Sequence, residues 1–236
     1  MKLRYFFYAA ILTLLTVSQS CNSSEKQNTK TTQPQSESTD EQTSEKGKTI
    51  LFFGNSLTAG YGVEEGEGFA EIIGKKLDSL GYDYRVINAG ISGETTSSGL
   101  RRVDWVMSKQ EVDVFVLELG ANDGLRGIPT SVTRSNLYEI IDKVREAQPD
   151  VKIVLAGMMV PPNMGQSYSD DFQSIFPDVA DTANVELIPF LLKDVGGIDS
   201  LNQDDGIHPN PKGHRILAKN TWDVLKDVIE KEKSAE

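Results

Sequence analysis

The sequence has a single cysteine, Cys21, and only two histidines, His208 and His214, among 236 residues. One thiol excludes an internal disulfide bond. Two imidazoles leave few ways to build a site that needs a histidine base. Clusters of lysine or arginine are also lacking, and the formal net charge is −11. Because phosphate backbones are bound by basic patches, this acidic balance argues against a nucleic-acid partner.

A long apolar run is lacking at the N-terminus as well. Tyr5–Val17 has 13 residues behind a basic start, whereas a membrane span needs roughly 20. This pattern predicts a signal peptide over residues 1–20 and an exported bacterial protein. The segment around Cys21 resembles the bacterial lipobox, although Ser18 replaces the usual aliphatic residue. The resemblance implies that Cys21 is acylated and anchors the protein to a membrane, in the periplasm or at the cell surface; the alternative is ordinary cleavage nearby.

Residues 22–48 contain no aliphatic or aromatic side chain in 27 positions. Such a segment cannot bury enough apolar surface to offset its ordering entropy. We therefore predict a disordered polar linker over residues 21–48, with ends roughly 30 Å apart. It is either a spacer that holds an enzyme off a membrane or a tail without a selected length.

Residues 49–230 are predicted to form one domain, followed by a tail at 231–236, because this length suffices for a sizeable core. Short apolar runs, rich in Val, Ile and Phe, alternate with segments of helical period. The predicted strands are Thr49–Phe53, Tyr84–Asn88, Val112–Leu119, Val151–Gly157 and Val185–Ile188. They lack two-fold alternation, as expected of strands covered on both faces. The alternation predicts an α/β fold with a parallel sheet and helices on both sides.

Three apolar stripes mark helices between or after these strands. They are Phe69–Leu80, Leu137–Val144 and Ile216–Ile229. The last stripe is preceded by Asn210, a good helix cap, and by Pro211 in the first turn.

Chemically distinctive residues follow the predicted strands, where parallel sheets carry their functional loops. Ser56 follows the first strand on a glycine-bearing turn, and Asp205 and His208 lie three residues apart before the last helix. A serine hydroxyl needs a base to become a nucleophile, and that base needs an acceptor on its second nitrogen. Ser56, His208 and Asp205 are therefore the candidate nucleophile, general base and orienting acid.

Acyl transfer also needs donors for the negative charge that develops on the carbonyl oxygen. The amides of Ser56 and Gly93 and the side-chain amide of Asn122 are the candidates for this oxyanion hole. Each has a plain structural alternative: a simple turn, a backbone requirement for glycine, and a loop brace. His214 is interpreted as structural or as a surface residue.

Four segments together resemble the SGNH (GDSL) hydrolases. They are Gly54-Asn55-Ser56-Leu57-Thr58, Gly93, Gly120-Ala121-Asn122-Asp123 and Asp205-Gly206-Ile207-His208-Pro209. Longer strings around 88–95, 118–127 and 203–210 are similar to the arylesterase, thioesterase I and lysophospholipase L1 subgroup, and the similarity runs from Thr49 to Ile229. One departure is Asn55, because the family usually has aspartate before the serine.

The resemblance implies a flavodoxin-like three-layer α/β/α sandwich with five parallel strands. It also implies the Ser56, His208, Asp205 triad, the Ser56, Gly93, Asn122 oxyanion hole, and no metal or organic cofactor. Its members hydrolyse lysophospholipids, aryl esters and acyl thioesters. Acyl-CoA is cytoplasmic, so an exported protein favours lysophospholipids, other monoacyl esters or aryl esters as small-molecule substrates.

Two other functions remain open at this point. One is a carbohydrate O-deacetylase of the same superfamily, which suits the outer location. The other is a non-catalytic binding lipoprotein with the same fold, to which Asn55 gives slight support. The segments Leu125–Val132 and Val160–Tyr168, which contain Gly and Pro, either shape an acyl pocket or are plain connections.

Overall fold

The computed structural model describes residues 47–233. The predicted signal peptide, Cys21 and nearly all of the predicted linker lie outside the described residues. The strands and helices run from Lys48 to Lys233, so the last helix extends three residues into the segment predicted as a tail at 231–236. None of the helices within residues 47–233 has the length and apolar character needed to cross a bilayer.

Five parallel strands form one sheet, as predicted. They are β1 (Lys48–Gly54), β2 (Tyr84–Gly90), β3 (Val114–Glu118), β4 (Lys152–Ala156) and β5 (Glu186–Ile188), in the spatial order β2-β1-β3-β4-β5. The central strands β1 and β3 are buried on both faces, which is why their sequences are continuous apolar runs. β1 begins at Lys48, one residue before the prediction, because pairing uses the main chain: the Lys48 N–H donates to the Asp83 carbonyl at 3.2 Å.

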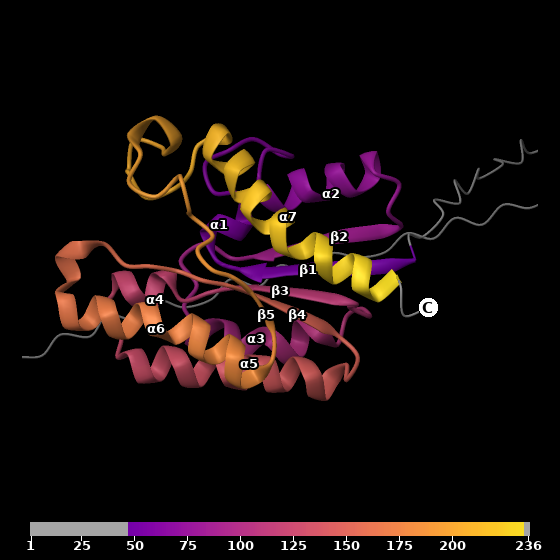
Figure 1. Cartoon of the computed structure of the whole chain (residues 1–236), viewed down its shortest axis with the longest axis horizontal. Helices are drawn as coiled ribbons and strands as arrows, with labels where there is room; N and C mark the ends of the chain where they lie inside the picture. The colour runs from indigo at the N-terminus through magenta and orange to yellow at the C-terminus, as the bar shows by residue number, and fades with distance from the viewer. Residues whose placement is uncertain (1–46, 234–236) are drawn as a thin grey trace, which may run out of the picture. The chain divides into compact units, whose positions relative to one another are not determined.

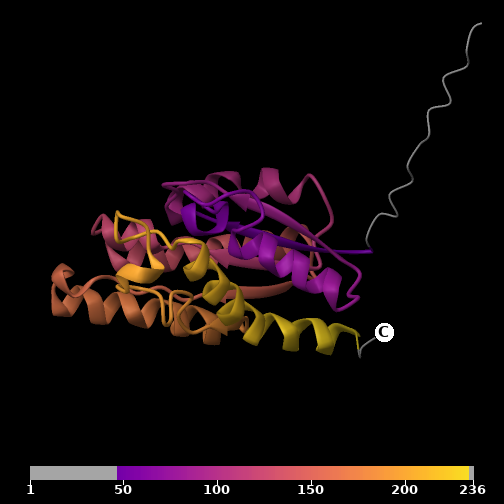
Figure 2. The ribbon, with the colours of Figure 1, turned by 90° about the horizontal axis from the view of Figure 1, so that it is seen from above.

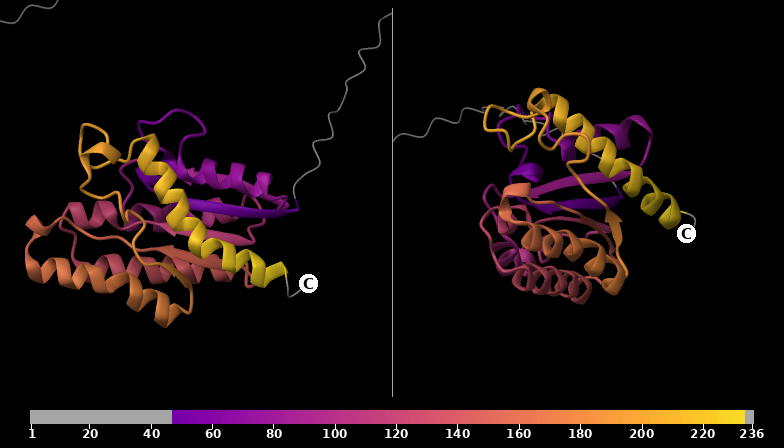
Figure 3. Two further views of the ribbon diagram at one scale, coloured as in Figure 1. Left: turned by 45° about the horizontal axis from the view of Figure 1, so that its top comes forward. Right: turned by 60° about the vertical axis from the view of Figure 1, so that its left-hand side comes forward.

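Helices cover both faces of the sheet, which gives the predicted three layers (Figure 1). α2 (Phe69–Ser79) and α7 (Pro211–Lys233) lie side by side on one face, as Figure 2 shows from above. α3 (Thr96–Met107), α5 (Thr130–Ala147) and α6 (Gln166–Ala183) form the other layer, visible below the sheet in the right panel of Figure 3. The strand order is that of flavodoxin-like folds, so the predicted fold class is confirmed.

The three apolar stripes lie on α2, α5 and α7, as predicted. The Asn210 side chain accepts hydrogen bonds from the amides of Lys212 (2.9 Å) and Gly213 (3.2 Å), so it caps α7. The long helices α3 and α6 were not predicted. α3 buries Thr96 and Gly99 beside few apolar residues, and this weakens its sequence signal.

Because the strands are parallel, their carboxyl ends share one edge, on the left in Figure 1. Four short helices lie in the loops near this edge: α1 (Ser56–Ala59), α4 (Ala121–Leu125), and the 3₁₀ turns η1 (Pro162–Met164) and η2 (Asp199–Leu201). β1 lies between β2 and β3, where the chain order of the strands reverses. Such a switch point is where open α/β sheets bind ligands.

Candidate active site

Ser56 lies at the switch point, at the start of α1 directly after β1. The turn is tight: a Cβ on Gly54 would collide with the side chains of Thr58 and Glu118, so only glycine fits there. Asn55 caps α1, and its Oδ1 accepts the Leu57 N–H at 2.9 Å. The turn therefore presents the Ser56 hydroxyl at the carboxyl edge of the sheet.

His208 joins the other two predicted catalytic residues. Its Nε2 lies 2.9 Å from Ser56 Oγ, and its Nδ1 lies 2.6 Å from Asp205 Oδ2. The second Asp205 oxygen accepts the amides of Ile207 and His208, each at 2.9 Å. The His208 amide, then its ring and the Ile207 amide, lower the pKa of Asp205 to about 2. An ionised Asp205 fixes the tautomer with hydrogen on Nδ1 and leaves Nε2 free to accept the serine proton.

Gln203 fastens the histidine loop to the nucleophile segment. Its Nε2 donates to the Tyr61 carbonyl (2.7 Å) and to the Pro209 carbonyl (2.9 Å). Its main-chain N–H donates to the His208 carbonyl at 2.7 Å. The Tyr61 ring also packs on the His208 ring, with centroids 4.7 Å apart. These contacts join segments that are 142 residues apart in the chain.

The three candidate oxyanion donors are placed differently. Asn122, in the first turn of α4, lines the same cavity as Ser56, and its Nδ2 is oriented by donation to the Glu94 carbonyl at 3.0 Å. The Ser56 N–H is in the first turn of a helix, where amides lack an intrahelical partner. Gly93 has φ +79° in the exposed β2–α3 loop and does not line the cavity. Its carbonyl accepts from Arg126 at 2.8 Å.

An ion pair between the partly buried Arg102 and the buried Glu94 supports this loop. Arg102 pairs with Glu94 through two hydrogen bonds, that from Nε measuring 2.6 Å, and its Nη2 donates to the Ala89 carbonyl at 2.8 Å. The guanidinium also lies 3.8 Å from the Phe53 ring centroid. The pair thus holds Glu94, whose carbonyl orients Asn122, against the ends of β1 and β2. Neither residue was predicted from the sequence to support the site.

A second buried carboxylate lies under the nucleophile turn. Glu118, at the end of β3, is fully buried and accepts four hydrogen bonds from two residues. Its Oε1 accepts from Asn55 Nδ2 at 2.7 Å. Its Oε2 accepts from the Asn55 N–H (3.1 Å), the Thr58 N–H (3.2 Å) and Thr58 Oγ1 (2.8 Å). Burial raises the pKa of Glu118 to about 7 despite these donors. An acid at the end of an apolar strand was the available signal.

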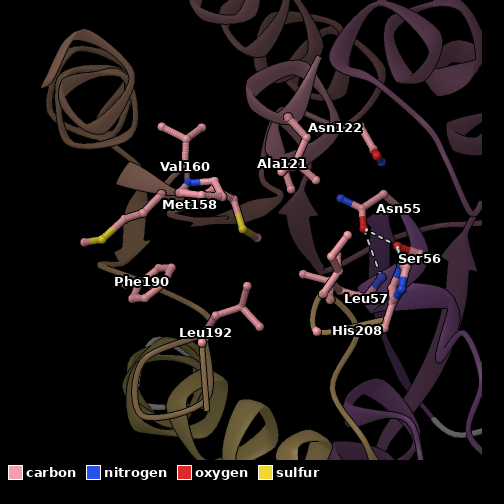
Figure 4. Close-up of a pocket in the computed structure, with 17 residues that line it drawn as sticks. Asn55, Ser56, Leu57, Ala121, Asn122, Met158, Val160, Phe190, Leu192 and His208 are labelled. Atoms are coloured by element: carbon pink, nitrogen blue, oxygen red, sulfur yellow. Dashed lines mark hydrogen bonds between the residues drawn. The ribbon is translucent and has the colours of Figure 1, made fainter. Parts of the chain in front are cut away.

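An apolar cavity of about 570 Å³ opens beside Ser56. Ser56 and His208 lie on one side, and Met158, Val160 and Phe190 face them across the space (Figure 4). The other lining residues are Asn55, Leu57, Ala121, Asn122, Leu125, Met159, Pro161, Leu192, Gly196, Gly197, Gly206 and Ile207. Of the two segments expected to shape an acyl pocket, only Leu125, Val160 and Pro161 contribute. Met158, Met159, Phe190, Leu192, Gly196 and Gly197 come from loops after β4 and β5 that carried no sequence signal, and the other lining residues belong to the segments that follow β1 and β3 or carry His208.

The chain is similar to known proteins over most of the domain that carries this site. The model of the GDSL-like lipase/acylhydrolase family matches residues 52–216, which include Ser56, Asn122, Asp205 and His208. The chain belongs to this family. The predicted family resemblance is therefore confirmed.

Individual family members are similar in sequence to this chain over most of the domain. Esterase TesA of Pseudomonas aeruginosa is 37% identical over 182 residues, 77% of this chain and 90% of that protein. Thioesterase 1/protease 1/lysophospholipase L1 of Escherichia coli is 34% identical over 170 residues, 72% of this chain and 79% of that protein. The crystal structure of the psychrotrophic esterase EstA from Pseudoalteromonas sp., inhibited by monoethylphosphonate, is 35% identical. The match spans 78% of this chain and 100% of the EstA chain, with a TM-score of 0.73.

His214 lies outside the candidate site of this family member. It is buried in α7, and its Nδ1 accepts the Phe69 N–H at 3.3 Å. Burial lowers its pKa to about 4, so the ring is neutral. Of the two interpretations, the structural one is correct and the surface one is wrong.

Proposed function

We propose that this protein is a serine esterase in which Ser56 is the nucleophile, His208 the general base and Asp205 the orienting acid. Family membership makes it a carboxylic ester hydrolase. The observation that carries the residue assignment is the His208 ring, which bridges Ser56 Oγ and Asp205 Oδ2 at 2.9 and 2.6 Å. This spacing is within the reach that proton transfer requires.

The reaction follows from the direction of those hydrogen bonds. Ser56 Oγ attacks the ester carbonyl carbon while His208 Nε2 takes its proton. The carbonyl oxygen becomes negative and is stabilised by the Ser56 amide and the Asn122 side chain. The Gly93 amide, the third donor that the family resemblance implies, lies outside the cavity lining. The C–O bond to the leaving group breaks, and that alcohol takes the proton from His208. Water then repeats the sequence on the acyl-enzyme and releases the carboxylic acid.

The cavity supports monoacyl lipids or aryl esters as substrates. Its wall is formed mainly by Leu, Ile, Val, Met and Phe side chains, which suit an acyl chain or an aromatic ring. An acetyl group would leave most of its volume unfilled, and this weighs against the O-deacetylase alternative. The short Ser56–His208 distance weighs against a binding protein without catalysis.

The N-terminal segment supports a location outside the cytoplasm. We propose cleavage after the signal peptide at residues 1–20, acylation of Cys21, and a flexible tether to the domain. Intact mass of the membrane-fraction protein tests this: the proposal expects a chain that starts at Cys21 and carries acyl groups. A chain that keeps Met1 in the cytoplasmic fraction would contradict it, and would reopen acyl-CoA as the substrate.

A substrate panel tests the proposed function. The purified protein is assayed on lysophosphatidylcholine, p-nitrophenyl esters of increasing chain length, palmitoyl-CoA and acetylated sugars, each beside the His208→Ala variant. We expect turnover of the lysolipid and aryl esters, lost in the variant. Acetate release from sugar with no turnover of longer acyl chains would refute the substrate class, and turnover unaffected by His208→Ala would refute the assignment.

A further inference from the structure

Exposed apolar side chains are concentrated around the mouth of the cavity. Within residues 47–233, nine large apolar side chains are exposed. Six of them are each 41–51% exposed and lie in loops at the carboxyl edge of the sheet: Tyr61, Ile91, Leu125, Met159, Ile198 and Ile207. We call these six the rim residues. The remaining three, Leu80, Trp105 and Val132, lie on or beside the long helices α2, α3 and α5.

The rim residues come from the five connections that follow the five strands, since Ile198 and Ile207 both lie between β5 and α7. Tyr61 follows α1, Ile91 follows β2, and Leu125 ends α4 behind β3. Met159 follows β4, Ile198 follows β5, and Ile207 precedes α7. Isolated apolar residues on a surface are ordinary. At least one in each of five connections around one opening is a pattern that single exposures do not explain.

Contacts or, for Ile198, position in the chain place each rim residue beside the site. Leu125, Met159 and Ile207 line the cavity themselves. The Tyr61 ring packs on His208. The Ile91 N–H donates to the Gly54 carbonyl at 2.9 Å, two residues before Ser56. Ile198 directly follows Gly197, which lines the cavity. The rim is thus continuous with the apolar wall of the cavity.

We propose that the rim residues dock the protein on a zwitterionic lipid surface, with the mouth of the cavity against the lipid. The inference rests on the proposed function, because a monoacyl ester resides in such a surface. When the mouth of the cavity lies against the lipid, the acyl chain of the substrate passes directly from the lipid into the apolar cavity and avoids water. Apolar side chains that enter the headgroup boundary are a general means of membrane-surface binding.

The charges near the rim select the kind of lipid surface. Glu64, Glu65, Asp204 and Asp205 are exposed in the same loops. Arg126 is an exposed cation there, and it donates to the Gly93 carbonyl. Binding to anionic lipids depends on clusters of Lys and Arg, which these loops lack. Neutral or zwitterionic headgroups therefore fit the rim, and an anionic surface is disfavoured.

The preceding chain is long enough to permit this orientation. β1 starts at the amino edge of the sheet, opposite the rim (Figure 1). The 26 residues at 22–47, between Cys21 and β1, reach up to about 90 Å when extended. The seven residues of β1 span only about 23 Å. An anchor at Cys21 therefore allows the opposite edge to face the same bilayer.

Site-specific labels test the orientation in the full chain. Cys21→Ser leaves a chain without cysteine, so one new thiol can be labelled with an environment-sensitive fluorophore. Ile91→Cys and Ile198→Cys report on the rim; Leu80→Cys and Trp105→Cys are matched exposed apolar positions elsewhere. With phosphatidylcholine vesicles we expect blue-shifted, brighter emission at 91 and 198 only, weakened when phosphatidylglycerol is added. Equal responses at all four positions, or none at 91 and 198, would overturn the proposal.

Turnover of substrate in vesicles tests whether docking on lipid assists hydrolysis. Ile91→Gln with Ile198→Gln alters two rim residues that do not line the cavity, and Leu80→Gln with Trp105→Gln is the matched control. We expect about a tenfold loss on lysophosphatidylcholine in phosphatidylcholine vesicles for the rim pair only, and unchanged turnover of soluble p-nitrophenyl butyrate. Equal vesicle turnover by both pairs would count against docking. If the unaltered chain hydrolysed no ester, the proposed function would fail, and the labels would still decide on docking.

Discussion

Replacement of Asn55 by aspartate restores the residue that the family usually carries, yet we predict that it destabilises this protein at alkaline pH. Asn55 Nδ2 donates to Glu118 Oε1 at 2.7 Å, and the other three partners of that carboxylate are donors as well. Asn55→Asp turns one donor into an acceptor. Two buried carboxylates would then face each other and must share a proton.

The size of the effect follows from the distance and from linkage. Two charges about 3 Å apart repel by about 5 kcal/mol at an effective dielectric constant of 20, or about four pKa units. The folded variant therefore retains one proton well above pH 7, whereas the unfolded chain binds none. In the native protein, Glu118, with a pKa of about 7, is ionised at higher pH in both states. Stability of the variant should fall by about 1.4 kcal/mol per pH unit above pH 7, relative to the native protein.

Urea denaturation at pH 7, 8 and 9 measures this slope. Asn55→Asp combined with Glu118→Gln is the decisive control. In this double variant the carboxylate is at position 55 and the amide donor is at position 118, so only one buried carboxylate remains. The additional loss of stability with rising pH should therefore disappear. Asn88→Asp, which faces Glu71 at the surface (2.5 Å), should show no extra slope because water solvates both charges. Equal pH slopes for the native protein and for Asn55→Asp would refute the reasoning.

Three further predictions concern supporting residues. Arg102→Lys keeps the charge but loses the forked contacts to Glu94 and the Ala89 carbonyl, so kcat should fall about tenfold with little change in KM; a rise in KM alone would contradict an oxyanion effect. Gln203→Glu puts a carboxylate against two carbonyls and should lower kcat on a soluble ester about tenfold, whereas an unchanged rate would show that the loop holds itself. His214 has its pKa lowered to about 4, so native stability should drop by about 2 kcal/mol between pH 6.5 and 5 through this group. His214→Gln should remove that component in urea titrations at the two pH values.

The positions of the strands could be predicted from local sequence. Strands buried on both faces are continuous apolar runs, and β1 to β5 begin and end within two residues of the prediction. Helix α6 was missed although Phe172, Ile175, Phe176 and Val179 form a buried stripe. Its start lies inside the segment predicted as a loop, and Pro177 lies within it, which is unusual for a helix interior.

In the candidate site, too, some residues could be predicted from the sequence and others could not. Ser56, Asn122, Asp205 and His208 were singled out because each lies in a distinctive string. Ser56, Asn122 and His208 line one cavity, and Asp205 contacts the His208 ring. The supports were missed because they pair across the sheet. Glu118 lies 63 residues from Asn55. One sequence, without coordinates, gives no sign of which buried donor meets which acceptor.

The central claim is that Ser56 is an activated nucleophile, and covalent labelling tests it directly. A fluorophosphonate reacts with a serine whose proton has an acceptor, here His208 at 2.9 Å. Mass spectrometry of the labelled, digested protein should find the adduct on Ser56 alone, with labelling abolished in Ser56→Ala and strongly reduced in His208→Ala. An unlabelled native protein, or an adduct that persists in Ser56→Ala, would contradict the account.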